Sequence, residues 1–197
     1  MLKIGITGGI GSGKTTVSSI FEVLGIPVYY ADVEAKKILN EDDSIIASIK
    51  KIFGEESYIN HQLNKKYIAS IVFTDPNKLN LLNQIVHPAT ISHANEWMNK
   101  QLSPYCIKEA ALIFESDSQK NLDYVIGVWA QEEIRIKRII KRDQLSKEEV
   151  LKRINNQMNE ELKMKNCDFV IHNNEIEMLT PQVIELHEKL LSMSLLT

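Results

Sequence analysis

The chain has 197 residues, 44% of them apolar and 25% charged, with a formal net charge of −3. These values are typical of one soluble globular domain, and they exclude a disordered charged tail, a collagen-like repeat and a coiled coil. The mild acidity argues against general nucleic-acid binding, and no apolar run approaches the roughly 18 residues of a membrane span. The strand-like start lacks the pattern of a secretory signal, so we expect a cytoplasmic protein.

The first predicted elements are a strand at 3–7 and a helix at 14–24, joined by a glycine-rich turn. Apolar side chains from Val17 to Leu24 recur at helical spacing, and Gly25 is placed to end the helix. A second short strand is predicted at 26–30. This order of strand, helix and strand opens an α/β fold.

From residue 31 to about 101 the pattern is helical and poor in strands. Turn-forming residues predict breaks within this stretch at three points: Gly54, Asp75-Pro76 and His87-Pro88. We therefore expect a helical insertion in the α/β core.

The remaining third of the chain returns to buried strands, predicted at 105–113, 124–129 and 167–171. A long basic helical stretch is predicted from about 131 to 164, and a final helix is predicted to begin with Thr180 as its cap and Pro181 at its first position. Cys106 and Cys167 lie in apolar runs, so we expect reduced core thiols and no disulfide scaffold.

The strongest motif is G-G-I-G-S-G-K-T-T at 8–16, which matches G-x-x-x-x-G-K-[ST] between the first strand and helix. Its glycines let backbone amides point at phosphate oxygens, and the helix N-terminus adds its positive end. Lys14 can reach the β- and γ-phosphates, and the Thr15 hydroxyl can bind Mg²⁺. A Rossmann fingerprint is excluded, because Lys14 stands where the third glycine belongs. The predicted nucleotide-binding set is Gly9, Gly11, Ser12, Gly13, Lys14, Thr15 and Thr16.

The motif and the element order together predict a P-loop NTPase fold, with a parallel sheet in a three-layer α/β core. We assign the core to 1–30, 102–130 and 166–197, a helical acceptor-binding insertion to 31–101, and a helical lid to 131–165. The GTPase element N-K-x-D is missing, because its nearest matches lack the Asp. A small-metabolite kinase fits these parts best, with a lid that keeps water from the phosphates.

The four arginines of the chain fall within 19 consecutive positions: Arg135, Arg138, Arg142 and Arg153. Guanidinium groups suit bidentate capture of phosphate, which favours a phosphate-closing lid. The alternative is an ordinary solvated helix face.

Three carboxylates are candidates at the acceptor side. Asp32 follows the second strand and could orient an attacking hydroxyl and accept its proton, or it could be the N-cap of a helix at 33–39. Glu109 and Glu115 flank the third strand and could contact Mg²⁺ through water, or serve as a cap or an edge residue.

These residues together resemble the dephospho-CoA kinase family over nearly the whole chain. The matching stretches are T-G-G-I-G-S-G-K-T-T at 7–16, L-G at 24–25, A-D at 31–32, L-N-Q-I-V-H-P at 82–88, L-I-F-E at 112–115, Arg138, R-D at 142–143, Gln157, and D-F-V-I at 168–171 with Asn173-Asn174. The P-loop alone is generic, but its combination with the A-D and H-P stretches is much more specific.

The resemblance implies transfer of phosphate from ATP, with Mg²⁺, to the ribose 3′-hydroxyl of dephospho-CoA, the last step of coenzyme A biosynthesis. It makes Asp32 the base, Lys14 the phosphate clamp, Arg142 a lid arginine and Asn173 part of the ATP site. The resemblance also implies an acceptor-binding set of Asp32, His87 and Glu115. For His87 the alternative is a packing role, as the residue before Pro88.

Two positions depart from the family pattern. Tyr30 replaces the first Asp of the usual D-A-D, and Ala111 replaces the Pro of the usual P-L-L-F-E. The rival functions are a kinase of the nucleoside monophosphate or shikimate type, and a nucleotide-binding regulatory module without transfer activity. We expect a monomer or a small homo-oligomer that acts on small molecules.

Overall fold

The computed structural model describes residues 1–196. The chain forms two compact units: one contains Met1–Tyr29 and the chain from Trp97 onward, and the other contains Tyr30–Glu96. Each has its own hydrophobic core. The first unit carries the sheet and the P-loop.

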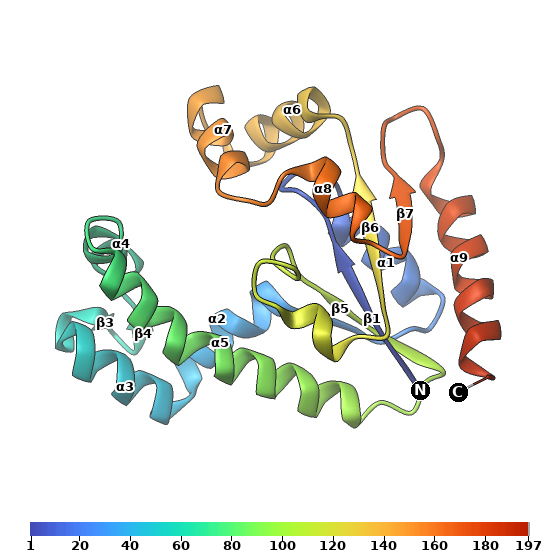
Figure 1. Ribbon diagram of the computed structural model, residues 1–197. Coiled ribbons are helices and arrows are strands. Elements are labelled where there is room, and N and C mark those ends of the chain that lie inside the picture. The colour runs from blue at the N-terminus through green and yellow to red at the C-terminus, as the bar shows by residue number, and fades with distance from the viewer. Residues whose placement is uncertain (197) are drawn as a thin grey trace. The chain divides into compact units, whose positions relative to one another are not determined.

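A five-stranded sheet in the order β2-β5-β1-β6-β7 forms the centre of the first unit (Figure 1). The pairs β1 with β5, β1 with β6, and β6 with β7 are parallel, and Ile4 of β1 is aligned with Ile107 of β5. Its strands are β1 (Leu2–Thr7), β2 (Val28–Tyr30), β5 (Tyr105–Glu109), β6 (Tyr124–Trp129) and β7 (Phe169–His172). The predicted α/β class with a parallel sheet is confirmed. Because β1 is the central strand, the loop after it opens at the middle of the carboxyl edge.

Helices α1 (Lys14–Val23) and α9 (Leu179–Ser194) cover one face of this sheet. Phe21 of α1 and Leu190 of α9 are fully buried against Ile4 and its neighbours. On the other face, α8 (Glu160–Lys165) packs beside β6, and its Met164 lies so close to Gly127 that a side chain there would collide with it. The three-layer arrangement is therefore present in this unit.

The second unit is built mainly of helices around a core that includes Ile49, Phe53 and Ile68. Its elements are α2 (Ala31–Glu41), α3 (Asp43–Phe53), η1 (Glu55–Ser57), β3 (Tyr58–Ile59), β4 (Gln62–Leu63), α4 (Lys65–Val72) and most of α5 (Pro76–Asn99), as far as Glu96. The prediction of a helical, strand-poor stretch is confirmed, apart from the short hairpin of β3 and β4.

Two of the three predicted breaks in this stretch are confirmed. Gly54 ends α3 at φ 88°, and the Asp75 carboxylate accepts the backbone amide of Asn77 at 2.9 Å where α5 begins. The break at His87-Pro88 is wrong, because α5 continues through Pro88. The fixed φ of proline is compatible with a helix, and the cost is one missing donor and local crowding.

Further along, the predicted strand at 105–113 ends earlier, at Glu109. Its neighbour β1 ends at Thr7, and the chain turns instead, with the Ser116 amide donating to the Leu112 carbonyl. The basic stretch is three helices, α6 (Glu132–Asp143), α7 (Lys147–Asn155) and α8, with α6 ended by Gln144 at φ 54°.

The N-cap predicted at Thr180 is also wrong. Helix α9 begins at Leu179, and Met178 is its N-cap. The helix therefore starts two residues earlier than predicted, and Pro181 is its third residue, within the first turn that proline tolerates.

No helix within residues 1–196 is long and apolar enough to cross a membrane. Both cysteines are free, as predicted. Cys106 is buried in β5, and the Cys167 thiol donates to the Lys163 carbonyl at 3.2 Å just before β7.

Candidate active site

The P-loop, residues 8–13, connects β1 to α1 at the centre of the carboxyl edge. Gly13 has φ 97°, and a side chain at this position would collide with the Asn173 amide, so only glycine fits. The first hydrogen bond of α1 runs from the Val17 amide to the Gly13 carbonyl at 3.1 Å. The amides of Thr15 and Thr16 thus belong to the first turn, where no carbonyl of the helix can accept from them, and they suit an anion.

A cavity of about 370 Å³ opens over this helix N-terminus. It is lined by Gly11, Gly13, Lys14, Thr15, Thr16, Arg138, Ile139 and Arg142. The Lys14 ammonium donates to the Gly8 carbonyl at 3.1 Å, so the side chain folds back along the loop. The structure therefore brings five predicted P-loop residues and the predicted lid arginine to one cavity.

Arg138 of α6 forms hydrogen bonds with the P-loop backbone. Its guanidinium donates to the carbonyls of Gly11 and Ser12, both at 3.4 Å, and to the Asn173 side chain at 3.2 Å. Sequence reasoning noted Arg138 only as part of the arginine cluster and the resemblance. Its distinguishing signal is its spacing, one helical turn before Arg142 on the same helix face.

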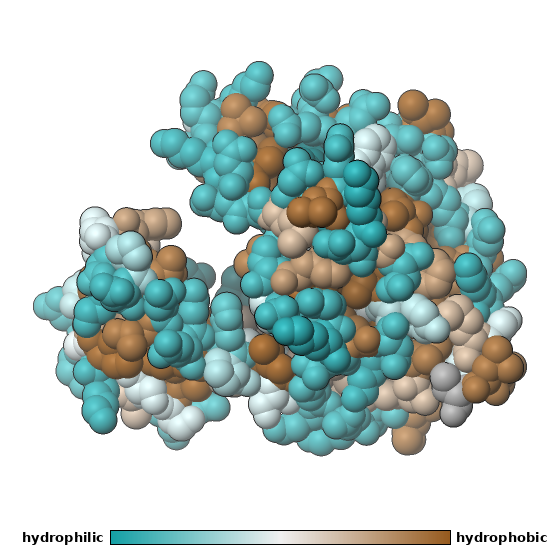
Figure 2. All heavy atoms as spheres, in the orientation of Figure 1, coloured by the Kyte–Doolittle hydropathy of each residue, from teal (hydrophilic) through white to brown (hydrophobic). Residues whose placement is uncertain are grey.

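Arg142 is more exposed and is paired with its neighbour Asp143. The two N–O distances are 2.7 and 3.0 Å, and hydrogen bonding to this carboxylate raises the pKa of Arg142. Arg153 of α7 reaches the same carboxylate at 3.5 Å. Hydrophilic side chains dominate the visible surface over α6 and α7 (Figure 2).

Asn173 follows β7 and supports the loop from the other side. Its amide donates to the Ser12 carbonyl at 2.7 Å, while Arg138 donates to the Asn173 carbonyl at 3.1 Å. The other three residues predicted to bind ATP do not line this cavity. Gly9 and Ser12 belong to the loop, and Asn173 holds it through the Ser12 carbonyl. Ser12 is fully buried, and its hydroxyl has no hydrogen-bond partner among residues 1–196.

Glu115 connects the segment after β5 to the segment before α8. Its carboxylate accepts the Met158 amide at 2.9 Å and the ammonium of the fully buried Lys163 at 3.0 Å. Burial by itself raises the pKa of Glu115, but the Met158 and Lys163 hydrogen bonds outweigh it and lower the pKa below the usual value. Glu109, the other candidate, is buried at the end of β5 beside Ile6.

We expect Glu115→Gln to lower the free energy of unfolding at pH 7 by about 2 kcal/mol, because it leaves the buried Lys163 ammonium without its counter-charge. Since the pKa of Glu115 is lowered in the folded state, its stabilisation is present above the unfolded-state pKa and is lost as pH falls through the folded-state pKa. Urea unfolding at pH 7 and in acid measures the effect. Equal stability of variant and wild type at pH 7 would contradict it.

Asp32 and His87 belong to the second unit. Asp32 is the second residue of α2, exposed, and the N-cap of this helix is Tyr30, which makes no capping hydrogen bond through its side chain. The interpretation of Asp32 as an N-cap is therefore wrong, and its carboxylate is accessible. His87 is exposed on α5, which does not agree with a packing role.

Within residues 1–196, no group of three or more His, Cys, Asp or Glu side chains could hold a metal ion by itself. The Thr15 hydroxyl, in the cavity lining, is the predicted Mg²⁺ ligand that the P-loop presents. This sparse donor set fits Mg²⁺, which keeps several waters and is bound through one or two protein oxygens together with substrate phosphates.

Comparisons with known proteins agree with one another. The family model described as dephospho-CoA kinase matches residues 2–178. A curated dephospho-CoA kinase of Bacteroides fragilis is 38% identical over 186 residues, which cover 94% of this chain and 91% of that protein.

Two solved structures also align with this chain over nearly its whole length. A Thermus thermophilus protein is 31% identical with a TM-score of 0.83, covering 98% of this chain and 97% of its own. A dephospho-CoA kinase from Campylobacter jejuni is 27% identical with a TM-score of 0.70, and the alignment covers 96% of this chain and 97% of that protein.

Proposed function

Because this chain belongs to the dephospho-CoA kinase family and is a kinase that phosphorylates dephospho-CoA with ATP in coenzyme A biosynthesis, we propose that Lys14, Asp32 and Arg142 carry the transfer to the ribose 3′-hydroxyl. The observation that carries this proposal is the cavity over the N-terminus of α1, where Lys14, Thr15 and Arg142 converge. The P-loop amides and Lys14 bind the β- and γ-phosphates there, and the lysine charge stabilises the migrating phosphoryl group.

Asp32 is the proposed base. An exposed carboxylate can accept the proton of the attacking hydroxyl and orient its oxygen. With Tyr30 in place of the usual first Asp, Asp32 is the one carboxylate of that pair in this chain. The proposed acceptor side also includes His87 and Glu115. The observed contacts of the Glu115 carboxylate are with Met158 and Lys163, which lie in the proposed lid region.

Mg²⁺ is the proposed metal, held by the Thr15 hydroxyl together with the ATP phosphates. When bound, it neutralises part of the phosphate charge. This chain contributes the hydroxyl and the loop that orients the phosphates.

The family match does not favour the alternative of a nucleoside monophosphate or shikimate-type kinase. A turnover panel with dephospho-CoA, AMP, dTMP and shikimate tests the assignment. We expect phosphorylation of dephospho-CoA alone. Faster transfer to another acceptor, or ATP consumption independent of any acceptor, would contradict it.

Arg142 is proposed to close over the phosphates. We expect Arg142→Ala to lower kcat by about 10- to 100-fold through loss of transition-state charge stabilisation, with little change in melting temperature because the side chain is exposed. Arg153→Ala is the matched control, since it pairs with the same Asp143 but does not line the cavity. Equal and small effects of both substitutions would favour a solvated helix face.

Residues 131–165 are proposed as the lid and 31–101 as the acceptor-binding insertion of the core. We also propose a cytoplasmic enzyme, supported by two free cysteines, which are typical of reducing compartments. A monomer or small homo-oligomer stays a prediction that sedimentation can test.

A further inference from the structure

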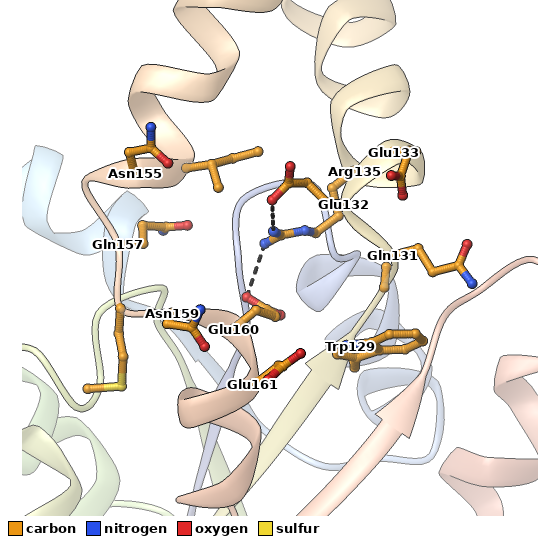
Figure 3. A pocket seen from close by; sticks show the side chains of 13 residues that line it. Trp129, Gln131, Glu132, Glu133, Arg135, Asn155, Gln157, Asn159, Glu160 and Glu161 are labelled. Atoms are coloured by element: carbon orange, nitrogen blue, oxygen red, sulfur yellow. Dashed lines mark hydrogen bonds and ion pairs between the residues drawn. The ribbon is translucent and has the colours of Figure 1, made fainter.

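A second cavity, of about 510 Å³, borders α6 and has a lining different from that of the cavity at Lys14. Its walls come from the end of β6, from α6 and from residues 154–161 (Figure 3). Most of its lining side chains are acidic or carry amides. Two of them, Gln157 and Glu160, reach from this cavity to the backbone of the P-loop.

Glu160 joins three segments through one carboxylate. Its Oε1 accepts the Gly9 amide at 3.2 Å, and its Oε2 accepts the Arg135 guanidinium of α6 at 3.0 Å. The Arg135 side chain is 4% exposed and that of Glu160 is 13% exposed, so this ion pair is shielded from solvent. Figure 3 shows Glu160 of α8 directed toward Arg135, which also has Glu132 beside it.

Gln157 adds a parallel contact. Its Oε1 accepts the Ile10 amide at 2.9 Å. The amides of Gly9 and Ile10 thus donate to Glu160 and Gln157. The amides of the first turn of α1 follow later in the chain, and no carbonyl of the helix accepts from them. The Gly9 and Ile10 amides are therefore held by protein groups, and the amides of the first turn of α1 are left to bind phosphate.

The close approach of Arg135 explains why residue 9 is glycine. A Cβ atom on Gly9 would collide with the Arg135 guanidinium. Arg138 and Arg142 follow Arg135 on the same helix at spacings of three and seven, so they share its face. Fixing Arg135 against the loop therefore sets where the other two arginines stand over the ATP cavity.

We propose that Glu160 is a positioning residue for phosphoryl transfer, which ties the first half of the P-loop to α6 and thereby aligns the phosphate-binding amides with Arg138 and Arg142. Gln157 supports it through Ile10. Neither side chain lines the cavity at Lys14, so both act through the loop and α6. This proposal rests on the proposed binding of ATP phosphates by the P-loop.

The test compares Glu160→Ala and Glu160→Gln with Glu161→Ala. Glu161 is the exposed neighbour on α8, borders the same second cavity and carries the same charge, and it makes no contact with the P-loop. We expect Glu160→Ala to lower kcat about 30-fold and raise KM for ATP several-fold, because misplaced reacting groups lose rate steeply, with KM for dephospho-CoA unchanged. Glu160→Gln keeps an oxygen for the Gly9 amide, so it should restore KM for ATP and only part of kcat. Glu161→Ala should stay within about twofold of wild type in both constants.

A ¹⁵N–¹H spectrum supplies a readout beyond activity. The Gly9 amide resonance should move in Glu160→Ala and much less in Glu160→Gln, because the glutamine oxygen still accepts it. The proposal is overturned if Glu160→Ala and Glu160→Gln keep kcat and the Gly9 resonance within the range of Glu161→Ala. If Glu160→Ala does not fold, Glu160→Gln decides by kcat: a partial loss supports the proposal, and a kcat within the range of Glu161→Ala overturns it.

Lys14→Ala in the same assay separates this proposal from the proposed function. Loss of turnover in Lys14→Ala with normal Glu160 variants rejects the positioning role and leaves the P-loop assignment intact. Normal turnover in Lys14→Ala rejects the P-loop assignment, and the positioning role falls with it.

Discussion

Lys14→Ala is expected to fold normally and to lose at least roughly two orders of magnitude in kcat. The Lys14 side chain lines the cavity over α1, its ammonium lies 3.1 Å from the Gly8 carbonyl, and we propose that its charge stabilises the phosphoryl group during transfer. The side chain is only partly buried, so its truncation costs little stability. Steady-state kinetics and a melting curve on the same preparation measure both effects.

Lys120→Ala is the matched control for this substitution. Lys120 lies in η2 (Ser118–Asn121), and its exposed ammonium pairs with Asp117. This segment precedes the amino end of β6, whereas the P-loop lies at the carboxyl edge of the sheet. It removes the same charge and should leave kcat unchanged. A folded Lys14→Ala enzyme with wild-type kcat would contradict the assignment of the P-loop as the phosphate-binding site.

Asp32→Asn is expected to keep the fold and lose about 10²- to 10⁴-fold in kcat, because an amide cannot accept the hydroxyl proton. Asp32 does not cap α2, so its contribution to stability is limited to the favourable position of an acidic residue in the first turn. Affinity for ATP should barely change, because the P-loop supplies it. Turnover, ATP binding and melting temperature are measured side by side.

Asp43→Asn provides the control for Asp32. Asp43 is an exposed acidic residue in the first turn of α3, in the same unit, so both substitutions remove one charge at an equivalent place in a helix. We expect similar small changes in melting temperature and a loss of kcat for Asp32→Asn alone. Near-normal kcat in a stable Asp32→Asn enzyme would remove Asp32 from the mechanism.

Local signals predicted much of the core. The strand at 124–129 is β6 as predicted, and the P-loop motif lies between β1 and α1 as its mechanism requires. The errors come from non-local effects. The apolar run beyond Glu109 has strand-like composition, but it leaves the sheet where β1 ends and the P-loop begins.

The helical errors have a similar origin. Pro88 stays inside α5, where the other hydrogen bonds of a 24-residue helix outweigh one missing donor. The first of the two breaks in the basic stretch occurs at Gln144, which adopts a left-handed conformation that is uncommon for glutamine. Neither outcome follows from composition alone.

In the site, sequence reasoning found most of the residues that line the cavity, and Asn173 beside them, but not the contacts that hold the loop in place. The bond between Gly9 and Glu160 joins positions 151 residues apart, and the bond between Ser12 and Asn173 joins positions 161 apart. The periodicity of apolar residues in a sequence gives information only about residues within a few helical turns of one another. The resemblance included Gln157 and Arg138 without a role for either, and their hydrogen bonds to Ile10, Gly11 and Ser12 now show what they hold.

Phosphorylation of dephospho-CoA by the purified protein, with the position of the new phosphate assigned by ³¹P NMR, tests the central claim most directly. The account predicts one new phosphomonoester on the ribose 3′-oxygen, formed with stoichiometric loss of the ATP γ-phosphate and abolished by Lys14→Ala. A phosphate on any other oxygen, or ATP hydrolysis with dephospho-CoA unchanged, would contradict it.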